Sequence, residues 1–318
     1  MEEPVLVQLH ALARAAAHPG ASSTCPCAVG VLADRTDGTV VRHGRLVLKS
    51  HAPDGERAAL RSRVEVAALP ELAGVLLPPL PSPRAALDGR LVTAWPYGVP
   101  VDPEDPGAAP WEEAGRLLAL LHRTPAPAGL PPMRAPLKAA LAVDRMRRAA
   151  PDHPATATVL RAWRTLTPEA GTPPASPGPG PLALCHGDFH LGQLVRAPRW
   201  LLIDVDDLGV GDPAWDLARP AAWFAAGLLA PEVWSRFLGA YEGAGGPATG
   251  SGRAGERDGD PWARLDVPAR ALTVQTAALA LAKSTAEGRP LDEVEDVMID
   301  TCGRIASLRT ELAPPASP

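Results

Sequence analysis

The residue types best suited to chemistry lie in two short stretches in the second half of the chain. Asp188 follows an apolar segment that predicts a strand, and the amide side chain of Gln193 comes five residues later. Asp204 and Asp206 follow a second apolar segment of the same kind. Magnesium takes oxygen ligands, usually one or two carboxylates together with substrate phosphates and water. Two strand ends that deliver acids and an amide therefore favour a Mg²⁺–phosphate site.

A single lysine points to the same chemistry. The basic residues are almost all arginine, and lysine occurs only at positions 49, 138 and 283. Lys49 ends the last of three short apolar runs, and in kinases a lysine on the third strand binds the phosphates that are not transferred. Because an ammonium is a compact point charge, a lysine at a strand end in this arginine-rich chain indicates a phosphate ligand.

Two glutamates are candidate partners for Lys49. Glu56 and Glu65 lie nine residues apart in a predicted helix, so they occupy opposite faces and only one can point at the lysine. Glu56 falls in the first turn, where the helix dipole alone explains an acid. We expect Glu65 to hold Lys49; the alternative is an exposed face on which it pairs with Arg61.

The acids and the amide are given separate roles. Asp188 is the candidate base, which orients an acceptor hydroxyl and accepts its proton. Gln193 offers an amide oxygen to the metal, and Asp204 is the carboxylate that bridges metal and phosphates. Asp206 points the same way as Asp204, since side chains alternate along a strand, and is expected to assist a metal or a substrate amine.

Histidines and further aspartates surround this set. We expect His186 to pack behind the loop, whereas His186, Asp188 and His190 together would suit the metal cluster of a hydrolase, an alternative that leaves Lys49 unexplained. Asp212 is expected to cap a helix that begins at Pro213. Asp216, in the first turn of that helix, is expected to tie it to the catalytic loop.

These residues need two kinds of scaffold. Apolar runs at 28–33, 39–42 and 45–49, separated by turn-forming residues, predict a β-meander. The turn at 34–38 is the one placed to cover phosphates, and it reads equally well as an ordinary hairpin turn. A helix capped by Asp54 and a strand at 90–95 complete this part.

Beyond residue 98 the pattern is mainly helical. Apolar residues recur with a helical period, and one hairpin carries the acids. Helices are expected near 5–17, 111–124, 136–149, 154–166, 231–241, 264–286 and 291–311. Stretches 168–180 and 243–260 are rich in Pro, Gly and small residues and are expected to be loops. A β-rich N-terminal lobe (1–96) and a larger helical lobe (97–318) are predicted, which gives an α+β chain.

Composition excludes several classes of protein. A net charge of −5 provides no basic field for nucleic acid or an anionic membrane. No signal peptide or run of about 20 apolar residues is present, so we expect a cytoplasmic protein without a membrane segment. Cys25-Pro-Cys27 could form half of a metal site, but no second close cysteine pair completes a zinc tetrad. Reduced, mostly buried thiols are therefore expected.

The motifs resemble the aminoglycoside phosphotransferase and choline kinase-like family, a branch of the protein-kinase fold. That family has a His-Gly-Asp-x-x-x-x-Asn loop and an Ile-Asp-x-x strand, and here the corresponding segments begin at His186 and Ile203. Gly-Asp-Pro-x-x-Asp-Leu-Ala at 211–218 and the Leu118–His122 helix also match. The resemblance runs from about residue 28 to 240 and is strongest in 185–218.

The resemblance implies a bilobal protein-kinase-like fold and an ATP/Mg²⁺-dependent transfer of the γ-phosphoryl group to a small hydroxylated molecule. Trp95 and Tyr97 fall where the hinge between lobes would contact adenine through its backbone. Gln193 replaces the usual asparagine, and the loop His-Gly-Asp-x-His-Leu-Gly-Gln resembles that of bacterial maltokinases. This favours a sugar or other polyhydroxylated acceptor. An aminoglycoside stays an alternative that would need an acidic wall, for which the candidates are Asp144, Glu256, Asp258, Asp260 and Glu287. The alternative, suggested by Gln193 and by the glycine-poor turn at 34–38, is a pseudokinase that binds nucleotide as a regulatory module.

Overall fold

In the computed structural model, most of the chain forms helices and short strands. The described residues are 3–20, 25–35, 38–52, 56–81, 87, 89–166, 182–249 and 260–312. By its internal contacts the chain divides into two compact units. Unit 1 holds Met1–Ala109 and Gly192–Asp206, and unit 2 holds Pro110–Leu191 and Asp207–Pro318. The lobe boundary expected near residue 96 stays a prediction; the contacts place 97–109 and 192–206 with the N-terminal part.

Unit 1 is built on the predicted β-meander. Its strands β1 to β4 form one antiparallel sheet in chain order, as expected from the apolar runs and turn residues. They are β1 (Val29–Arg35), β2 (Gly38–His43), β3 (Leu46–His51) and β4 (Val92–Pro96). The register places Lys49 of β3 between Val40 of β2 and Thr93 of β4. Of the turn at 34–38, residues 36 and 37 lie outside the described residues.

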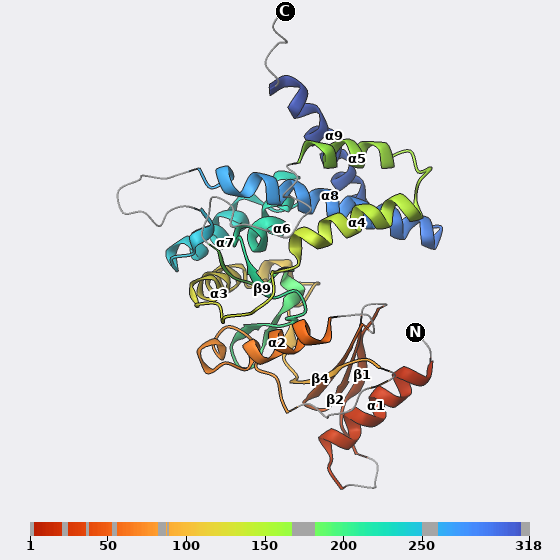
Figure 1. Ribbon diagram of the computed structural model, residues 1–318, viewed down its shortest axis with the longest axis vertical. Helices are drawn as coiled ribbons and strands as arrows, with labels where there is room; N and C mark the ends of the chain where they lie inside the picture. The colour runs from red at the N-terminus through yellow and green to blue at the C-terminus, as the bar shows by residue number, and fades with distance from the viewer. Residues whose placement is uncertain are drawn as a thin grey trace, which may run out of the picture. The chain divides into compact units, whose positions relative to one another are not determined.

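Helix α1 (Glu3–Ala17) packs against this sheet (Figure 1). Its buried residues Val5, Leu9 and Ala13 repeat with a helical period, so they share one face. That face contacts apolar residues of the sheet, among them Val41 and Leu48. The contact is small, and the other apolar residues of α1 are partly buried or exposed.

Helix α2 (Arg57–Ala67) follows β3. Its buried face includes Leu60, Val66 and Ala67. The cap expected at Asp54 lies outside the described residues, and the residue that precedes the helix is Glu56.

The predicted single hairpin of acids is wrong. The strands that precede Asp188 and Asp204 do not pair with each other. In unit 1, β8 (Trp200–Leu202) pairs with β7 (Leu194–Arg196), which pairs with β5 (Val99–Pro100). In unit 2, β6 (Ala183–Cys185) pairs with β9 (Gly209–Gly211). The strands β5, β7 and β9 are only two or three residues long, so they leave no alternating pattern in the sequence.

Unit 2 is a helical unit with the β6–β9 pair beside it (Figure 1). Helix α8 contacts α4, α5, α6 and α9, while α3 packs on α7. The helices are α3 (Trp111–Arg123), α4 (Ala135–Ala149), α5 (Thr156–Thr165), α6 (Ala214–Ala225), α7 (Pro231–Gly243), α8 (Trp262–Glu287) and α9 (Glu293–Leu312). The helices expected from periodicity are confirmed. Most of the two expected loops lies outside the described residues.

Gly115 explains how closely α3 and α7 approach. A Cβ at this position would collide with the carbonyl oxygen of Phe237 in α7.

None of the helices in the described part of the chain has the length and apolar character needed to cross a membrane.

Candidate active site

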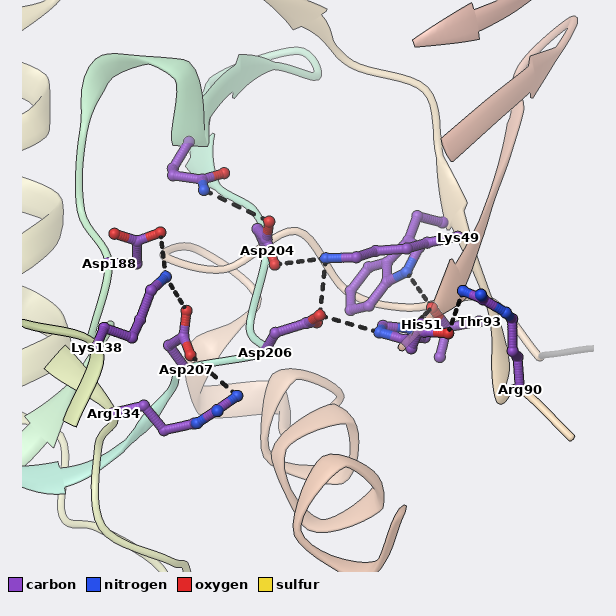
Figure 2. A network of polar contacts seen from close by, with 12 residues as sticks. Lys49, His51, Arg90, Thr93, Arg134, Lys138, Asp188, Asp204, Asp206 and Asp207 are labelled. Carbon is purple, nitrogen blue, oxygen red and sulfur yellow. Dashed lines mark hydrogen bonds and ion pairs between the residues drawn. The ribbon is translucent and has the colours of Figure 1, made fainter. Parts of the chain in front are cut away.

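In unit 1 the strand lysine is held by two carboxylates. Lys49 Nζ lies 2.7 Å from Asp204 Oδ1 and 3.0 Å from Asp206 Oδ2 (Figure 2). Burial by itself would lower the pKa of Lys49, but the charges of the two acids outweigh it and raise the pKa above its usual value. The structure thus brings these three residues together, and their common role in a site stays a prediction. The ammonium is fixed and charged.

Asp206 continues the network into the sheet. Its Oδ2 lies 3.0 Å from His51 Nδ1, and His51 Nε2 lies 2.8 Å from Thr93 Oγ1, which also accepts the indole N–H of Trp95 at 2.9 Å. Burial would raise the pKa of Asp206, but Lys49 and His51 lower it far below the usual range. The carboxylate is therefore ionised, and its orientation is fixed from the sheet.

Asp204 has an unusual backbone. Its φ of 64° lies in the left-handed region, which residues other than glycine rarely adopt and which costs free energy. Such strain often marks functional sites. Gln193 Nε2 lies 3.5 Å from Asp204 Oδ2, and the Ile203 N–H donates to the Gln193 carbonyl at 2.9 Å. The two predicted metal ligands are thus neighbours.

The expected glutamate partner of Lys49 is not found among its ion pairs. Glu65 and Glu56 are both exposed in this structure, and the acids that contact Lys49 are Asp204 and Asp206. The inward face of α2 includes the buried Arg63 instead.

The predicted hinge residues lie at the end of β4. Trp95 is buried and its indole is bound to Thr93. The Tyr97 N–H donates to the carbonyl of Arg45 at 2.8 Å, and its ring carries the guanidinium of Arg42 at 3.5 Å from the centroid. Their contact with adenine stays a prediction.

In unit 2, Asp188 is held by two cations. Asp188 Oδ2 lies 2.7 Å from Lys138 Nζ of α4, and Oδ1 accepts from Arg219 of α6 at 3.0 Å. Burial would raise the pKa of Asp188, but the charges of Lys138 and Arg219 outweigh it and lower the pKa. A carboxylate of this kind is ionised at neutral pH and can accept a hydrogen bond from a hydroxyl.

Lys138 also binds Asp207. Neither this contact nor the contact of Lys138 with Asp188 was predicted from the sequence. Its Nζ lies 2.7 Å from Asp207 Oδ2, and Arg134 lies 3.6 Å from the other oxygen (Figure 2). The scarcity of lysine, which identified Lys49, marks Lys138 equally well. From the sequence, Lys138 was placed in the helix expected near 136–149, and no role was predicted for it.

Asp216 fastens the segment before Asp188. Its carboxylate accepts the backbone N–H of His186 at 2.6 Å and of Gly187 at 2.7 Å, and it lies 2.9 Å from His122 Nε2. His122 Nδ1 in turn lies 2.8 Å from the hydroxyl of Tyr241. The expectation that Asp216 ties its helix to the loop is confirmed. Asp212 accepts the N–H of Ala214 at 3.0 Å, but α6 begins at Ala214 and the residue directly before it is Pro213, one position later than expected.

Gly187 lets the loop approach its neighbour. Its φ is +81°, and a Cβ here would collide with the carbonyl of Asp207.

The alternative of a hydrolase metal cluster is not favoured, because Asp188 contacts two cations. Among the described residues, the groups of His, Cys, Asp and Glu close enough to hold a metal do not include His186, Asp188 and His190 together.

A pocket in unit 2 contains Asp188 in its wall. It is lined by aromatic, cationic and amide groups as well as the carboxylate, namely Ala135, Lys138, Gly187, Asp188, Phe189, Trp215, Arg219, Leu272 and Gln275. The amide oxygen of Gln275 is buried and has no hydrogen-bond partner among the described residues. A buried acceptor of this kind suits a ligand hydroxyl, because leaving it unpaired is costly.

The sequence matches the model of one protein family. Residues 31–257 match the phosphotransferase enzyme family. The chain belongs to this family. The match spans Lys49, Asp188, Gln193 and Asp204, and therefore contributions from both units. No curated protein matches the chain.

Solved structures show the fold. A choline/ethanolamine kinase family protein from Mesorhizobium loti is 21% identical, with a TM-score of 0.59 over 98% of this chain and 96% of that one. A macrolide 2'-phosphotransferase type I is 22% identical, with a TM-score of 0.51 over 99% and 98%. Choline kinase LicA from Streptococcus pneumoniae is 13% identical, with a TM-score of 0.57 over 88% and 93%. The α+β, protein-kinase-like fold predicted from the sequence is confirmed.

Proposed function

We propose that the chain transfers the γ-phosphoryl group of ATP, with Mg²⁺, to a hydroxyl of a small molecule. The observation that carries the proposal is the fixed, charged Lys49 beside Asp204 and Gln193 in unit 1. A lysine, a carboxylate and an amide are what a phosphate–magnesium site requires. The family match supports the same reaction.

The donor set fits magnesium. Asp204 and Gln193 offer oxygen atoms, the hard ligands that Mg²⁺ prefers. When bound, magnesium neutralises charge on the phosphates. Lys49 would bind the phosphates that are not transferred, and Asp206 with His51 would keep the lysine aligned. Before the substrate binds, Lys49 and Asp204 compensate each other's charge. In the complex, phosphate would pair with Lys49 and magnesium with Asp204.

Asp188 would orient the acceptor hydroxyl and accept its proton. Its low pKa makes it a weak base, so its main contribution is orientation, and the proton moves late in the transfer. Lys138 and Arg219 would hold the carboxylate ionised and aligned. Catalysis then comes chiefly from positioning and from charge stabilisation.

The pocket in unit 2 favours a neutral polyhydroxylated acceptor such as a sugar. Trp215 and Phe189 offer apolar surfaces, and Gln275 offers an acceptor for a hydroxyl. The cations Lys138 and Arg219 in the lining would repel a polycationic aminoglycoside.

The acids considered for binding a polycation do not line this pocket. Asp144 pairs with Arg147 in an exposed contact, Asp260 accepts the N–H of Trp262, and Glu287 pairs with Arg289. Residues 256 and 258 lie outside the described residues.

The test is mass spectrometry of acceptor-dependent phosphorylation across sugars, aminoglycosides and amino alcohols. Wild type should phosphorylate a neutral polyol. Asp188→Asn should lower kcat about 10²–10⁴-fold, the usual contribution of a positioned base. The exposed variant Asp144→Asn serves as the control and should keep wild-type activity. Turnover by Asp188→Asn equal to that of the wild type would refute the mechanism. Faster turnover of an aminoglycoside than of a neutral polyol would refute the proposed acceptor class.

A further inference from the structure

Unit 1 contains a second group of potential ligands, which we term the Cys2His2 cluster: His18, Cys25, Cys27 and His43. One thiol sulfur or imidazole nitrogen from each residue lies within 4.8 Å of the other three. None of the four has a role in the phosphoryl transfer described above. The cluster therefore needs its own explanation.

The cluster pairs each thiol with one imidazole. Cys25 Sγ lies 3.1 Å from His43 Nε2, and Cys27 Sγ lies 3.3 Å from His18 Nε2. The two imidazole rings meet edge to face, with centroids 5.3 Å apart. Zinc binds sulfur at about 2.3 Å and nitrogen at about 2.0–2.1 Å, which in a tetrahedron puts sulfur and nitrogen roughly 3.5 Å apart. The observed separations are close to that edge length.

Three separate segments supply the ligands. His18 follows the last residue of α1, the cysteines precede β1, and His43 is the last residue of β2. The turn after His43 brings the cysteine segment close, since the Gly44 N–H donates to the carbonyl of Ala28 at 2.7 Å. Gly44 has a φ of +60°, and a Cβ there would lie 3.3 Å from Cys27 Sγ. The tight turn therefore serves the approach of Cys27.

We propose that the Cys2His2 cluster binds one Zn²⁺ ion in a tetrahedral structural site. Two thiolates and two imidazoles form a donor set that zinc favours. Four protein ligands leave no open position for substrate, so the site is structural rather than catalytic. From the sequence, no zinc tetrad was expected, because there is no second close cysteine pair. In the proposed site, His18 and His43 take the place of that pair.

The zinc would fasten α1 to the sheet that carries Lys49. The apolar contact of α1 involves few buried residues, so an ion that joins the end of α1 to β2 adds a cross-link where packing is limited. Binding then stabilises the folded form, because the preformed ligand set does not exist in the unfolded chain.

The test is the zinc content of the full chain, produced without a polyhistidine tag and measured by inductively coupled plasma mass spectrometry. About one zinc ion per chain is expected, as in a single Cys2His2 site. The double variant Cys25→Ser/Cys27→Ser should lose it. The control Cys302→Ser removes a buried thiol of unit 2 and should keep the zinc. Cobalt added to the metal-free wild type should give thiolate-to-cobalt charge-transfer bands and the strong visible bands of tetrahedral Co²⁺.

If the double variant does not fold, the cobalt spectrum of the wild type and the fall in its melting temperature on adding a chelator decide the question. A wild-type chain without zinc that also gives no thiolate band would overturn the proposal. So would a double variant that retains its zinc, or a Cys25–Cys27 disulfide in the intact mass. Each of these outcomes leaves the phosphotransferase proposal standing, since the two rest on different residues.

Discussion

Lys49 and Lys138 each neutralise a pair of carboxylates, one pair in each unit. Lys49 binds Asp204 and Asp206, while Lys138 binds Asp188 and Asp207. Both lysines are largely buried, and in both the nearby acids outweigh burial and raise the pKa. A compact ammonium can lie between two carboxylates, whereas the planar fork of arginine favours one bidentate partner. This explains the use of lysine at these two positions in an arginine-rich chain.

Removing the charge of Lys138 should change the pH profile. Asp188 must be ionised, so activity is present above its pKa and is lost as pH falls through it. Lys138 helps to lower that pKa, and in Lys138→Met the acidic limb of kcat/KM should therefore move to higher pH. The exposed Lys283→Met is the matched control. An unchanged acidic limb in Lys138→Met would show that Asp188 is not the titrating group.

Gln275 should set the affinity for the acceptor. Gln275→Leu removes the buried amide oxygen that we expect to accept an acceptor hydroxyl. A lost neutral hydrogen bond is worth about 0.5–1.5 kcal/mol, so KM for the acceptor should rise roughly 2- to 10-fold. KM for ATP should not change. Steady-state kinetics with each substrate varied in turn measures both, and an equal rise in the two constants would contradict the assignment.

Gln193 offers a direct test of the metal site. Gln193→Asn restores the residue that is usual in related loops but shortens the side chain by one methylene. If Gln193 is a metal ligand, the Mg²⁺ concentration for half-maximal activity should change in Gln193→Asn. Gln193→Ala should need more Mg²⁺ than both the wild type and Gln193→Asn. Titration of activity with Mg²⁺ at saturating ATP gives the three values. Identical curves would remove Gln193 from the metal site.

At the scale of elements, unit 2 is organised around one buried carboxylate. Asp216 on α6 reaches the backbone that follows β6 and the imidazole of His122 on α3. Burial would raise the pKa of Asp216, but the hydrogen bond and charge of His122 and the charge of His186 outweigh it and lower the pKa. The carboxylate thus connects two helices and the loop that presents Asp188.

Asp216→Asn should therefore destabilise the chain. The amide keeps the size of the side chain but removes the charge and one acceptor, so we expect a loss of about 3–5 kcal/mol in the free energy of unfolding. Urea denaturation followed by circular dichroism measures it. Because the pKa of Asp216 is lowered in the folded state, its contribution is present above the unfolded pKa and declines as pH falls through the folded one. Asp144→Asn, in an exposed ion pair, should stay within about 0.5 kcal/mol.

Several elements were predictable because their patterns are local. The meander and the long helices follow from apolar periodicity and turn residues. The strand β7 was missed because its three residues are too few to show a pattern, whereas β5 and β9 were missed because their pairing partners lie far away in the sequence. The same reason applies to the Cys2His2 cluster, whose histidines become neighbours of the cysteines only when the meander and α1 are formed.

At the scale of the whole molecule, the motifs pointed to candidate catalytic residues but not to their ion-pair partners. Asp188, Gln193 and Asp204 were found from their spacing after apolar segments. Glu65 was expected at Lys49 because it lies in the middle of its helix, where the dipole does not explain an acid, yet Asp204 and Asp206 contact the lysine instead. The choice between competing carboxylates depends on tertiary distances, which a helical period does not contain.

Nucleotide binding should stabilise the whole chain and separate binding from chemistry. At 100 times its Kd, Mg²⁺–ATP should add about 2.7 kcal/mol, which corresponds to a rise of roughly 5 °C in Tm. Lys49→Met and Asp204→Ala should lose this rise, because they remove the phosphate and metal ligands. Asp188→Asn should keep it while losing turnover, since Asp188 acts on the acceptor. Differential scanning fluorimetry with and without Mg²⁺ distinguishes these cases. A rise that needs no Mg²⁺, with no turnover of any acceptor by wild type, would instead identify a pseudokinase, because nucleotide would then bind without the metal that phosphoryl transfer requires.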